Sequence, residues 1–274
     1  MQKREIKLGE LVFVGLGLYD EKDLSLRALE EIGTAEKIFA ELYTSLMPAL
    51  DMGQLERLAG KRVTIISRKV LEDEEGQQIL RETEQGKVVF LVPGDPMIAT
   101  THVDLQIRAK KMGIKTRIVH GASIISAVIG LTGLQNYKFG RSVTVPLAEK
   151  GVTAGTPYKV IMENKKRGLH TLCFLDIRAE ENRYMTVKDG LSALLAVEER
   201  NRKSVVTPDV LAVGIARAGA PDYRIKAGYI KELLDYGFGS PPHTIIFPGK
   251  LHFMEAEALV TLADAPQKVS EMAR

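Results

Sequence analysis

Short apolar runs alternate with amphipathic helical patterns through the first half of the chain, and this alternation restricts the fold more than any other feature. Each run is rich in β-branched and aromatic residues and is followed by a stretch with helical periodicity. Strands that alternate with helices usually form a mostly parallel sheet, because each helix returns the chain across a face of the sheet. The predicted strands are LVFVGLG at 11–17, KIFAEL at 37–42, RVTII at 62–66, KVVFLV at 87–92 and TRIVH at 116–120.

The second half has a different rhythm and predicts a second α/β unit. Its predicted strands cover 141–146, 170–177, 209–219 and 243–249, with helices between them, one of them around GYIKELLDYG at 228–237. We place the N-terminal domain at 9–133, the C-terminal domain at 134–263 and a loose tail at 264–274. No linker-like composition separates the domains, so we expect them to pack closely and to form a cleft that binds a ligand.

Composition excludes several classes of protein. Lys and Arg number 38 against 35 for Asp and Glu, and a net charge of +3 gives no concentrated basic face for nucleic acid. The single cysteine, Cys173, lies in the apolar run LCFL and is expected to be a buried hydrophobe. Glu10 interrupts the first apolar run, no signal-peptide cleavage pattern follows, and no stretch is long enough to span a bilayer. We therefore expect a globular cytoplasmic protein.

GLGLYD at 15–20 follows the first predicted strand and resembles the start of a dinucleotide-binding turn. Glu41, at the end of the second strand, imitates the acidic ribose ligand of such folds. Asp20 stands where the fingerprint needs its third glycine, so a helix cannot pack against the strand in the same way. We expect a glycine turn that brings backbone close to another ligand, and we disfavour a nicotinamide site.

A Gly-Asp-Pro turn at 94–96 follows the fourth strand. Gly94 can adopt a positive φ and Pro96 fixes the backbone after it, and this turn holds the Asp95 carboxylate at the carboxyl end of a strand, where open α/β sheets bind ligands. An aspartate that only accepts a hydrogen bond from its own turn fits the spacing as well. Thr101 is predicted to cap the next helix, with Asp104 in an approximate capping box and Gly113 at its end.

Further turns lie at other strand ends. Ser123 in HGASIISA is an expected N-cap that can still face a ligand, since Ile125 replaces the second glycine of a nucleophile elbow. His243 in GSPPH opens an apolar strand and is either a ligand contact or a plain strand-entry residue. With ARAG at 216–219 and PGK at 248–250, these turns suggest a ligand held largely by backbone atoms. The histidines and Cys173 lack metal-ligand spacing, so no metal site is predicted.

Taken in order, several longer strings of this chain resemble the diphthine synthase family, S-adenosylmethionine-dependent methyltransferases of diphthamide biosynthesis. The resemblance covers roughly residues 10–262 and implies a tetrapyrrole methylase-like fold, that of class III methyltransferases, with an interdomain cofactor cleft. The strings are GLGLYDEKDLSLRALE at 15–30, FAELYTSLM at 39–47, VPGDPMIATTH at 92–102, ASIISAVIGLTGLQNYKFG at 122–140, GLHTLCFLDIRAE at 168–180, RYMTV at 183–187, GIARAG at 214–219 and PPHTIIFPGKLHFMEAEAL at 241–259.

The resemblance implies which residues contact S-adenosylmethionine and which substrate is methylated. The substrate is elongation factor 2, at a histidine that carries a 3-amino-3-carboxypropyl group, and the enzyme is a homodimer. Insertions of eukaryotic members seen between LDIRAE and RYMTV are absent, which favours the archaeal version that stops at three methyl groups. The positions that match cofactor contacts are Leu18, Asp95, Ile98, Ser123, Ile124, Phe174, Ala218 and His243.

The base that accepts the substrate's proton is not identified by any motif. Candidates are Glu41, Tyr43, His102 and Tyr137, and solvent is a further one. A docking face for the protein substrate could include Lys138, Arg141 and the basic run 165–167. Two alternatives stay open: a tetrapyrrole-type methylase of small molecules, against which YTSLM and ATTH argue, and a non-catalytic nucleotide-binding module built on GLGLYD.

Overall fold

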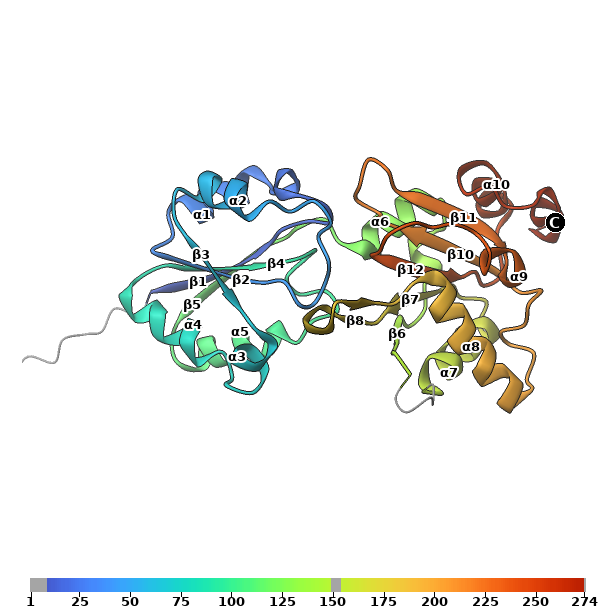
Figure 1. The fold of residues 1–274 in the computed structure, drawn as a ribbon, viewed down its shortest axis with the longest axis horizontal. Coiled ribbons are helices and arrows are strands. Elements are labelled where there is room, and N and C mark those ends of the chain that lie inside the picture. Colours follow the sequence, from blue (N-terminus) through green and yellow to red (C-terminus); the bar gives the residue numbers. More distant parts are fainter. Residues whose placement is uncertain (1–8, 149–153, 274) are drawn as a thin grey trace, which may run out of the picture. The chain divides into compact units, whose positions relative to one another are not determined.

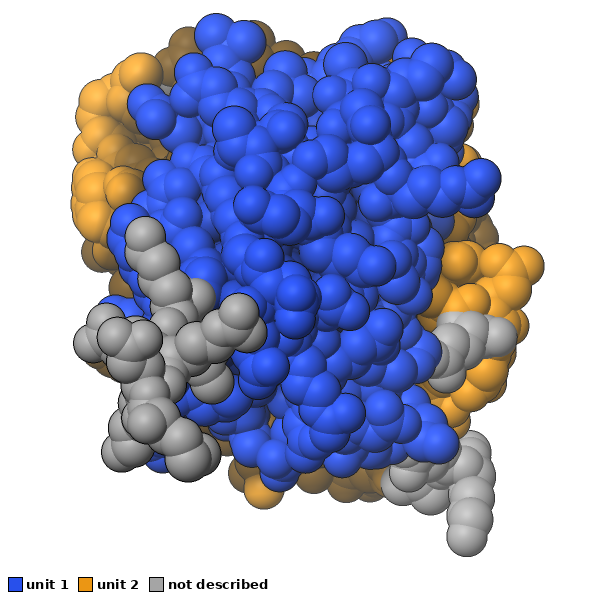
Figure 2. Space-filling view, turned by 90° about the vertical axis from the view of Figure 1, so that its left-hand side faces the viewer, with its two compact units in different colours: residues 1–123 blue, residues 124–274 orange. Residues whose placement is uncertain are grey.

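The computed structural model describes residues 9–148 and 154–273, which divide into two compact units after Ser123 (Figures 1 and 2). The sequence places this boundary later, after residue 133. Helix α6, Ile124–Thr132, explains the difference, because its Val128 belongs to the same buried cluster as Ile246 and Leu259 of the second unit. The helix is therefore part of the second core.

Unit 1 contains a parallel five-stranded sheet in the order β3-β2-β4-β1-β5, as the alternating pattern predicts (Figure 1). All five residues of β4 are buried, which explains its continuous apolar run. The strands are β1 (Glu10–Gly15), β2 (Lys37–Glu41), β3 (Val63–Ile66), β4 (Val88–Val92) and β5 (Lys115–Val119).

Helices cover both faces of this sheet. Alternate strand residues such as Val12 and Val89 form one core with α1 and α2, and Phe90 on the other face contacts the His102 ring edge-on at 5.2 Å between centroids. Helix α5 begins after Thr101 as expected, but the Thr101 side chain makes no cap hydrogen bond, so the predicted capping box is wrong. The helices are α1 (Leu26–Gly33), α2 (Met52–Ala59), α3 (Arg68–Glu72), α4 (Gln77–Glu82) and α5 (His102–Lys111), with 3-10 turns η1 (Glu21–Asp23) and η2 (Thr83–Gln85).

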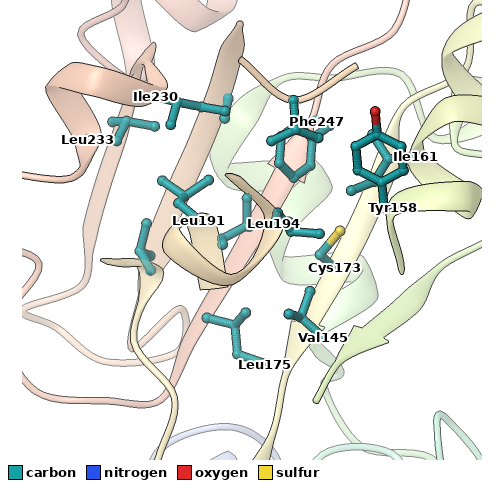
Figure 3. Packing of buried hydrophobic residues seen from close by; sticks show 14 of the residues in the cluster. Val145, Tyr158, Ile161, Cys173, Leu175, Leu191, Leu194, Ile230, Leu233 and Phe247 are labelled. Atoms are coloured by element: carbon teal, nitrogen blue, oxygen red, sulfur yellow. The ribbon is translucent and has the colours of Figure 1, made fainter. Parts of the chain in front are cut away.

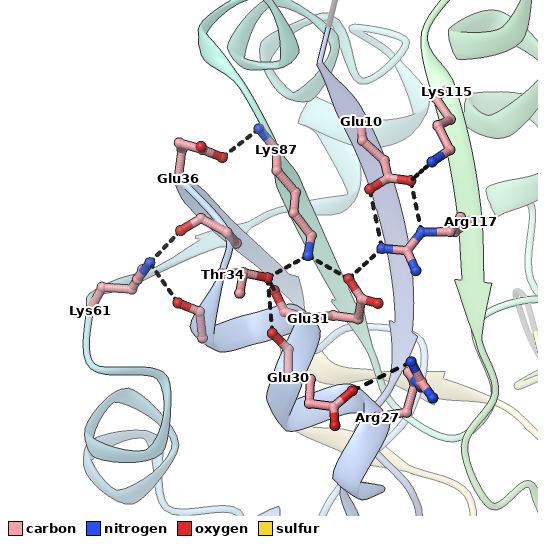
Figure 4. Close-up of polar contacts among 12 residues, drawn as sticks. Glu10, Arg27, Glu30, Glu31, Thr34, Glu36, Lys61, Lys87, Lys115 and Arg117 are labelled. Atoms are coloured by element: carbon pink, nitrogen blue, oxygen red, sulfur yellow. Dashed lines mark hydrogen bonds and ion pairs between the residues drawn. The ribbon is translucent and has the colours of Figure 1, made fainter.

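Charged side chains tie the amino-terminal ends of the unit 1 strands together (Figure 4). Arg117 of β5 donates through Nε and Nη2 to Glu10 of β1, at 2.7 and 3.1 Å, and through Nη2 to Glu31 of α1 at 2.6 Å. Lys87, just before β4, lies 2.5 Å from the same Glu31 carboxylate. The network occupies the edge at which the strands begin, opposite the edge where the Gly-Asp-Pro turn lies.

Unit 2 contains a mixed five-stranded sheet in the order β11-β10-β12-β7-β6 (Figure 1). β10 runs antiparallel to both neighbours, and only β6 and β7 pair in parallel. A separate hairpin joins β8 and β9. The strands are β6 (Val143–Val145), β7 (Thr171–Leu175), β8 (Ile177–Arg178), β9 (Arg183–Tyr184), β10 (Leu211–Ala216), β11 (Arg224–Tyr229) and β12 (His243–Phe247).

Two hydrophobic layers enclose the unit 2 sheet. One packs α7 and α8 on the sheet, and Figure 3 shows Tyr158, Cys173 and Phe247 among its side chains. Cys173 is fully buried, as predicted, and burial raises the pKa of its thiol, so it is inert. The other layer contains α6, α10 and η5. The helices are α7 (Thr156–Lys166), α8 (Val187–Asn201), α9 (Ile230–Leu233) and α10 (Phe253–Leu262), with 3-10 turns η3 (Asn136–Lys138), η4 (Ala179–Glu181) and η5 (Gln267–Ala273).

Two segments of unit 2 differ from expectation. The helix predicted at 228–237 is only α9, because the preceding residues form β11 at the sheet edge. The segment after residue 263 is not a loose tail, since η5 buries Val269 in the core. Among the described helices, none combines the length and the apolar character needed to cross a membrane.

Candidate functional site

Three turns at the carboxyl edge of the unit 1 sheet touch through their backbones. The Gly94 N–H donates to the Gly17 carbonyl at 2.6 Å, which joins the turns after β1 and β4. A Cβ on Gly15 would lie 2.5 Å from the Gly94 oxygen, and one on Gly121 would lie 2.4 Å from it. No larger residue fits at Gly15 or Gly121 without a shift of the backbone. This is expected of turns whose backbones line a binding edge.

Asp95 lies on the middle turn and is 7% exposed. Its Oδ1 accepts a hydrogen bond from the Met97 N–H at 3.0 Å. This is the hydrogen bond within its own turn that the sequence allowed as an alternative to a ligand contact. Its Oδ2 lies 2.7 Å from Nδ1 of His120, at the end of β5. His120 was not a predicted site residue, because its partner lies 25 positions away and only the strand order β4-β1-β5 brings them together.

The GLGLYD turn does not have the geometry of a nicotinamide site. Leu18 and Tyr19 donate their N–H groups to Asp23 Oδ2, each at 2.8 Å, and so these groups are already used. Asp20, at the position of the missing glycine, caps the short turn η1, and α1 begins only at Leu26. A dinucleotide fold would instead offer a helix start to the pyrophosphate directly after the turn.

The remaining predicted contacts of the first half lie on the same loops. Ile98 follows the Gly-Asp-Pro turn and is 37% exposed, so its side chain reaches the surface of these loops. Ser123 is buried at the end of unit 1, and Ile124 begins α6 and packs partly against the unit 2 core.

The structure brings three of the base candidates together within unit 1. Glu41 ends β2, His102 begins α5, and His102 Nε2 lies 3.7 Å from Glu41 Oε1. Tyr43 follows Glu41 and lies below the Arg68 guanidinium, 5.2 Å from the ring centroid. All three side chains are buried, at 0% exposure for Glu41, 1% for His102 and 6% for Tyr43.

Tyr137 is not part of this cluster. It lies on η3 of unit 2, is 74% exposed and donates its hydroxyl to Gln135 Oε1 at 2.6 Å. The ammonium of its neighbour Lys138, a predicted docking residue, is held within unit 2 by the buried Glu255 carboxylate and by the Lys250 carbonyl. Lys165 donates to the Val205 carbonyl at 3.3 Å, so it is also engaged within unit 2.

The predicted contacts of the second half lie at one end of the unit 2 sheet. In the strand register Phe174 pairs with Thr244, and His243 pairs with Ala216, two positions before Ala218. The His243 ring is fully used: Nδ1 accepts from Val187 N–H at 3.1 Å, so Nε2 carries the proton and donates to the Ser240 carbonyl at 3.1 Å. Burial lowers the pKa of His243, which keeps it neutral. Neither ring nitrogen is therefore free to form a further hydrogen bond with a ligand.

Arg217, which the sequence analysis did not single out, organises this end of the sheet. It is 6% exposed and adopts φ +51°, a strained backbone for a residue other than glycine. Its guanidinium donates to the carbonyls of Phe238 and Ser240 and to the carboxylate of Asp222. The motif ARAG gave no signal for this role, because the carbonyls come from a loop more than twenty residues away.

Comparison with known proteins gives consistent matches over most of the chain. The family described as Tetrapyrrole (Corrin/Porphyrin) Methylases matches residues 10–234. Diphthine synthase of Methanocella arvoryzae is 51% identical over 92% of this chain and 98% of its own length, and that of Methanocaldococcus jannaschii is 47% identical over 93% and 99%. A crystal structure of diphthine synthase superimposes with a TM-score of 0.87 at 41% identity, covering 96% of this chain and all of that one.

Proposed function

The chain belongs to the tetrapyrrole methylase family and, within it, to the diphthine synthases, and from this premise we propose the reaction and the residues that carry it. It is an S-adenosylmethionine-dependent methyltransferase of diphthamide biosynthesis. The proposed reaction is trimethylation of the amino group of the 3-amino-3-carboxypropyl-histidine on elongation factor 2, which gives diphthine. A homodimer is the proposed active form.

One observation supports the cofactor site most strongly. The turns after β1, β4 and β5 touch at the carboxyl edge of a parallel sheet, leave no space for a Cβ, and present the Asp95 carboxylate among them. A polar carboxylate, close backbone and the exposed apolar side chain of Ile98 fit a ligand that has both a polar and an apolar part. The proposed contacts are Leu18, Asp95, Ile98, Ser123 and Ile124 from one set of loops, and Phe174, Ala218 and His243 from the other.

Bound S-adenosylmethionine supplies a methyl group on a sulfonium, and departure of a neutral sulfide needs no acid. The residues of this chain therefore have to bind, orient and exclude water. The Asp95 carboxylate, oriented by Met97 and His120, would accept hydrogen bonds from the polar part of the cofactor. The Ile98 side chain would contact its apolar part. In unit 2 the His243 ring would hold its strand end, next to Phe174 in the register, in place through Val187 and Ser240.

The substrate experiment tests the reaction directly. The protein is incubated with labelled S-adenosylmethionine and the modified elongation factor 2 intermediate, and the mass of the factor is read. We expect a gain of three methyl groups. A gain of four would contradict the stopping point, and no gain on the factor would overturn the proposed function. Methylation of a small macrocycle would instead support a tetrapyrrole-type methylase.

Replacing Asp95 tests the cofactor site. Asp95→Ala should weaken binding of S-adenosylhomocysteine by about tenfold or more, because a charge-assisted hydrogen bond contributes about 1.5–3 kcal/mol. Asp95→Asn keeps the Oδ1 acceptor for Met97 and should lose less. Calorimetric titration measures both, with Asp104→Asn on the exposed face of α5 as the control. Equal affinity of Asp95→Ala and the wild type for S-adenosylhomocysteine would exclude Asp95 as a contact. In a separate titration, tight binding of NAD to the wild type would favour a nucleotide-binding module.

A further inference from the structure

The buried Glu41–His102 pair has a proton arrangement that the proposed reaction does not use. The side chains of both residues are completely enclosed within unit 1. A group that takes the proton from a substrate amine must reach that amine directly or through one water. Because both side chains are buried, their contribution must come from the loops that they join.

The hydrogen bonds of His102 define which nitrogen carries its proton. Nδ1 lies 3.1 Å from the Pro96 carbonyl oxygen, which can only accept, so Nδ1 is the donor. Nε2 consequently presents a lone pair, and among the described residues no group forms a hydrogen bond with it. What faces this lone pair is the carboxyl group of Glu41, with Oε1 3.7 Å away.

The Glu41 carboxyl group is well supplied with donors on its other sides. Oε2 accepts from the N–H groups of Tyr43 and Thr44 at 3.0 and 3.1 Å, and Oε1 accepts from the Thr44 hydroxyl. If Glu41 were ionised, its Oε1 would face the Nε2 lone pair with no hydrogen between them. A proton on Oε1 converts this repulsion into an attraction and leaves the other hydrogen bonds intact.

The local electrostatics favour the same arrangement. Burial raises the pKa of Glu41. This effect is larger than the opposing effect of the hydrogen bonds from Thr44 and Tyr43 and of the Arg68 charge. Burial also lowers the pKa of His102 to about 4, although the Pro96 carbonyl opposes the shift. Burial therefore favours the neutral form of both groups.

We infer that Glu41 and His102 are a positioning pair in which the carboxyl proton of Glu41 faces the Nε2 lone pair of His102. The pair fixes the Asp95–Pro96 turn from inside unit 1 and does not deprotonate the substrate. The chain of contacts runs from Thr44 through Glu41 and His102 to the Pro96 carbonyl, next to Asp95. It links the YTSLM segment to the ATTH segment. The inference rests on the proposed function for the role of Asp95, but the state of the proton is independent of it.

The variant Glu41→Gln separates positioning from base catalysis. Its amide can keep the carbonyl acceptor for Tyr43 and Thr44 and place N–H donors toward His102 and the Thr44 hydroxyl. We expect kcat within about threefold of the wild type, whereas loss of a general base costs about 10²–10⁴-fold. A loss of about 100-fold or more in a folded variant would overturn the inference and identify Glu41 as the base.

Thermal unfolding measures the protonation of Glu41 without any turnover. A carboxyl group whose folded pKa is raised stabilises the fold below its unfolded pKa of about 4.5, and this contribution is lost as pH rises through the folded pKa. The wild type should lose it and Glu41→Gln should not, so the Tm difference, variant minus wild type, should increase between about pH 5 and about pH 8. The exposed Glu30→Gln on α1 is the matched control and should show no such increase. A constant difference for Glu41→Gln would overturn the inference that Glu41 is protonated in the folded protein.

Replacing His102 tests the effect on the turn. His102→Phe keeps a ring against Phe90 but removes the donor to Pro96, and we expect about tenfold weaker binding of S-adenosylhomocysteine. Unchanged affinity and kcat/KM in His102→Phe would overturn the positioning role. If the wild type itself failed to methylate elongation factor 2 while the Tm difference rose with pH, the proposed function would be wrong and the proton pair correct.

Discussion

Replacing Glu255 with alanine is expected to destabilise unit 2 by about 3–5 kcal/mol, the usual effect of removing one partner of a buried ion pair. Glu255 is fully buried at the start of α10. Its carboxylate accepts from the ammonium of Lys138, from His170 Nε2 at 2.9 Å, and from the N–H groups of Gln135 and His252 at 2.9 and 2.8 Å. The substitution removes the acceptor of His170 Nε2 and of the Gln135 and His252 N–H groups, and leaves Lys138 with the Lys250 carbonyl. Hydrogen exchange of unit 2 peptides measures the loss.

The same carboxylate gives a pH dependence of defined sign. Burial opposes ionisation of Glu255, but the hydrogen bonds from His252, Lys138 and Gln135 outweigh it and lower its pKa to about 2. A lowered carboxyl pKa stabilises the fold above the unfolded value of about 4.5 and loses this effect as pH falls through the folded value. The wild type should lose about 2 kcal/mol from this group by about pH 3, and Glu255→Gln should not.

Exposed Glu257→Ala on the same helix is the control for Glu255→Ala and should change stability by less than about 0.5 kcal/mol. A similar loss in the control, or no loss in Glu255→Ala, would contradict the role of this cluster.

The hydrogen bonds of Glu255 bring several separate strings of the sequence together in the fold. Gln135 and Lys138 come from QNYKFG, His170 from GLHTL, and Glu255 from KLHFMEAEA. His170 also accepts from Gly249 N–H at 2.9 Å, which adds the turn before α10. Periodicity could not predict these contacts, because 85 to 120 positions separate the carboxylate from these partners.

The parallel sheet of unit 1 was predictable because each of its strands repeats a local pattern. Buried parallel strands have continuous apolar runs, and β1 and β4 have this character throughout their cores. The edge strand β11 lacks it: RIKAGY has an exposed first residue and only two buried ones, so it was assigned to a helix and loop instead. The two-residue strands β8 and β9 are too short to have any period.

The candidate site was predictable at the level of turns but less so at the level of side chains. Glycines next to strand ends correctly indicated where backbones approach each other, as Gly15 and Gly121 do. The roles of His120 and Arg217 depend on neighbouring strands and on a distant loop, and neither has a local signal. For His243 the sequence left a ligand contact and a strand-entry role open, and the hydrogen bonds show that both ring nitrogens have partners within unit 2.

Replacing Gly121 with alanine should weaken cofactor binding strongly. Its Cβ would lie 2.4 Å from the Gly94 oxygen and 2.9 Å from the Gly15 carbonyl carbon, and both obstacles are backbone atoms that cannot rotate away. The turn that carries Asp95 must shift, and a displacement of about 1 Å in a positioned group costs about 100-fold in rate. We therefore expect affinity for S-adenosylhomocysteine to fall by about 10–100-fold, with a loss of about 1–3 kcal/mol in the stability of unit 1 from overpacking.

Gly33→Ala is the matched control, because a Cβ at the end of α1 would meet nothing within 4 Å. That variant should bind like the wild type and be slightly more stable, since alanine favours a helix over glycine by about 0.5–1 kcal/mol. Calorimetric titration with S-adenosylhomocysteine and hydrogen exchange of unit 1 peptides measure both effects. If Gly121→Ala lowers stability but keeps full affinity, the three contacting turns support the fold without forming the cofactor site. If affinity falls by more than the loss of stability can explain, the result supports a cofactor site at these turns.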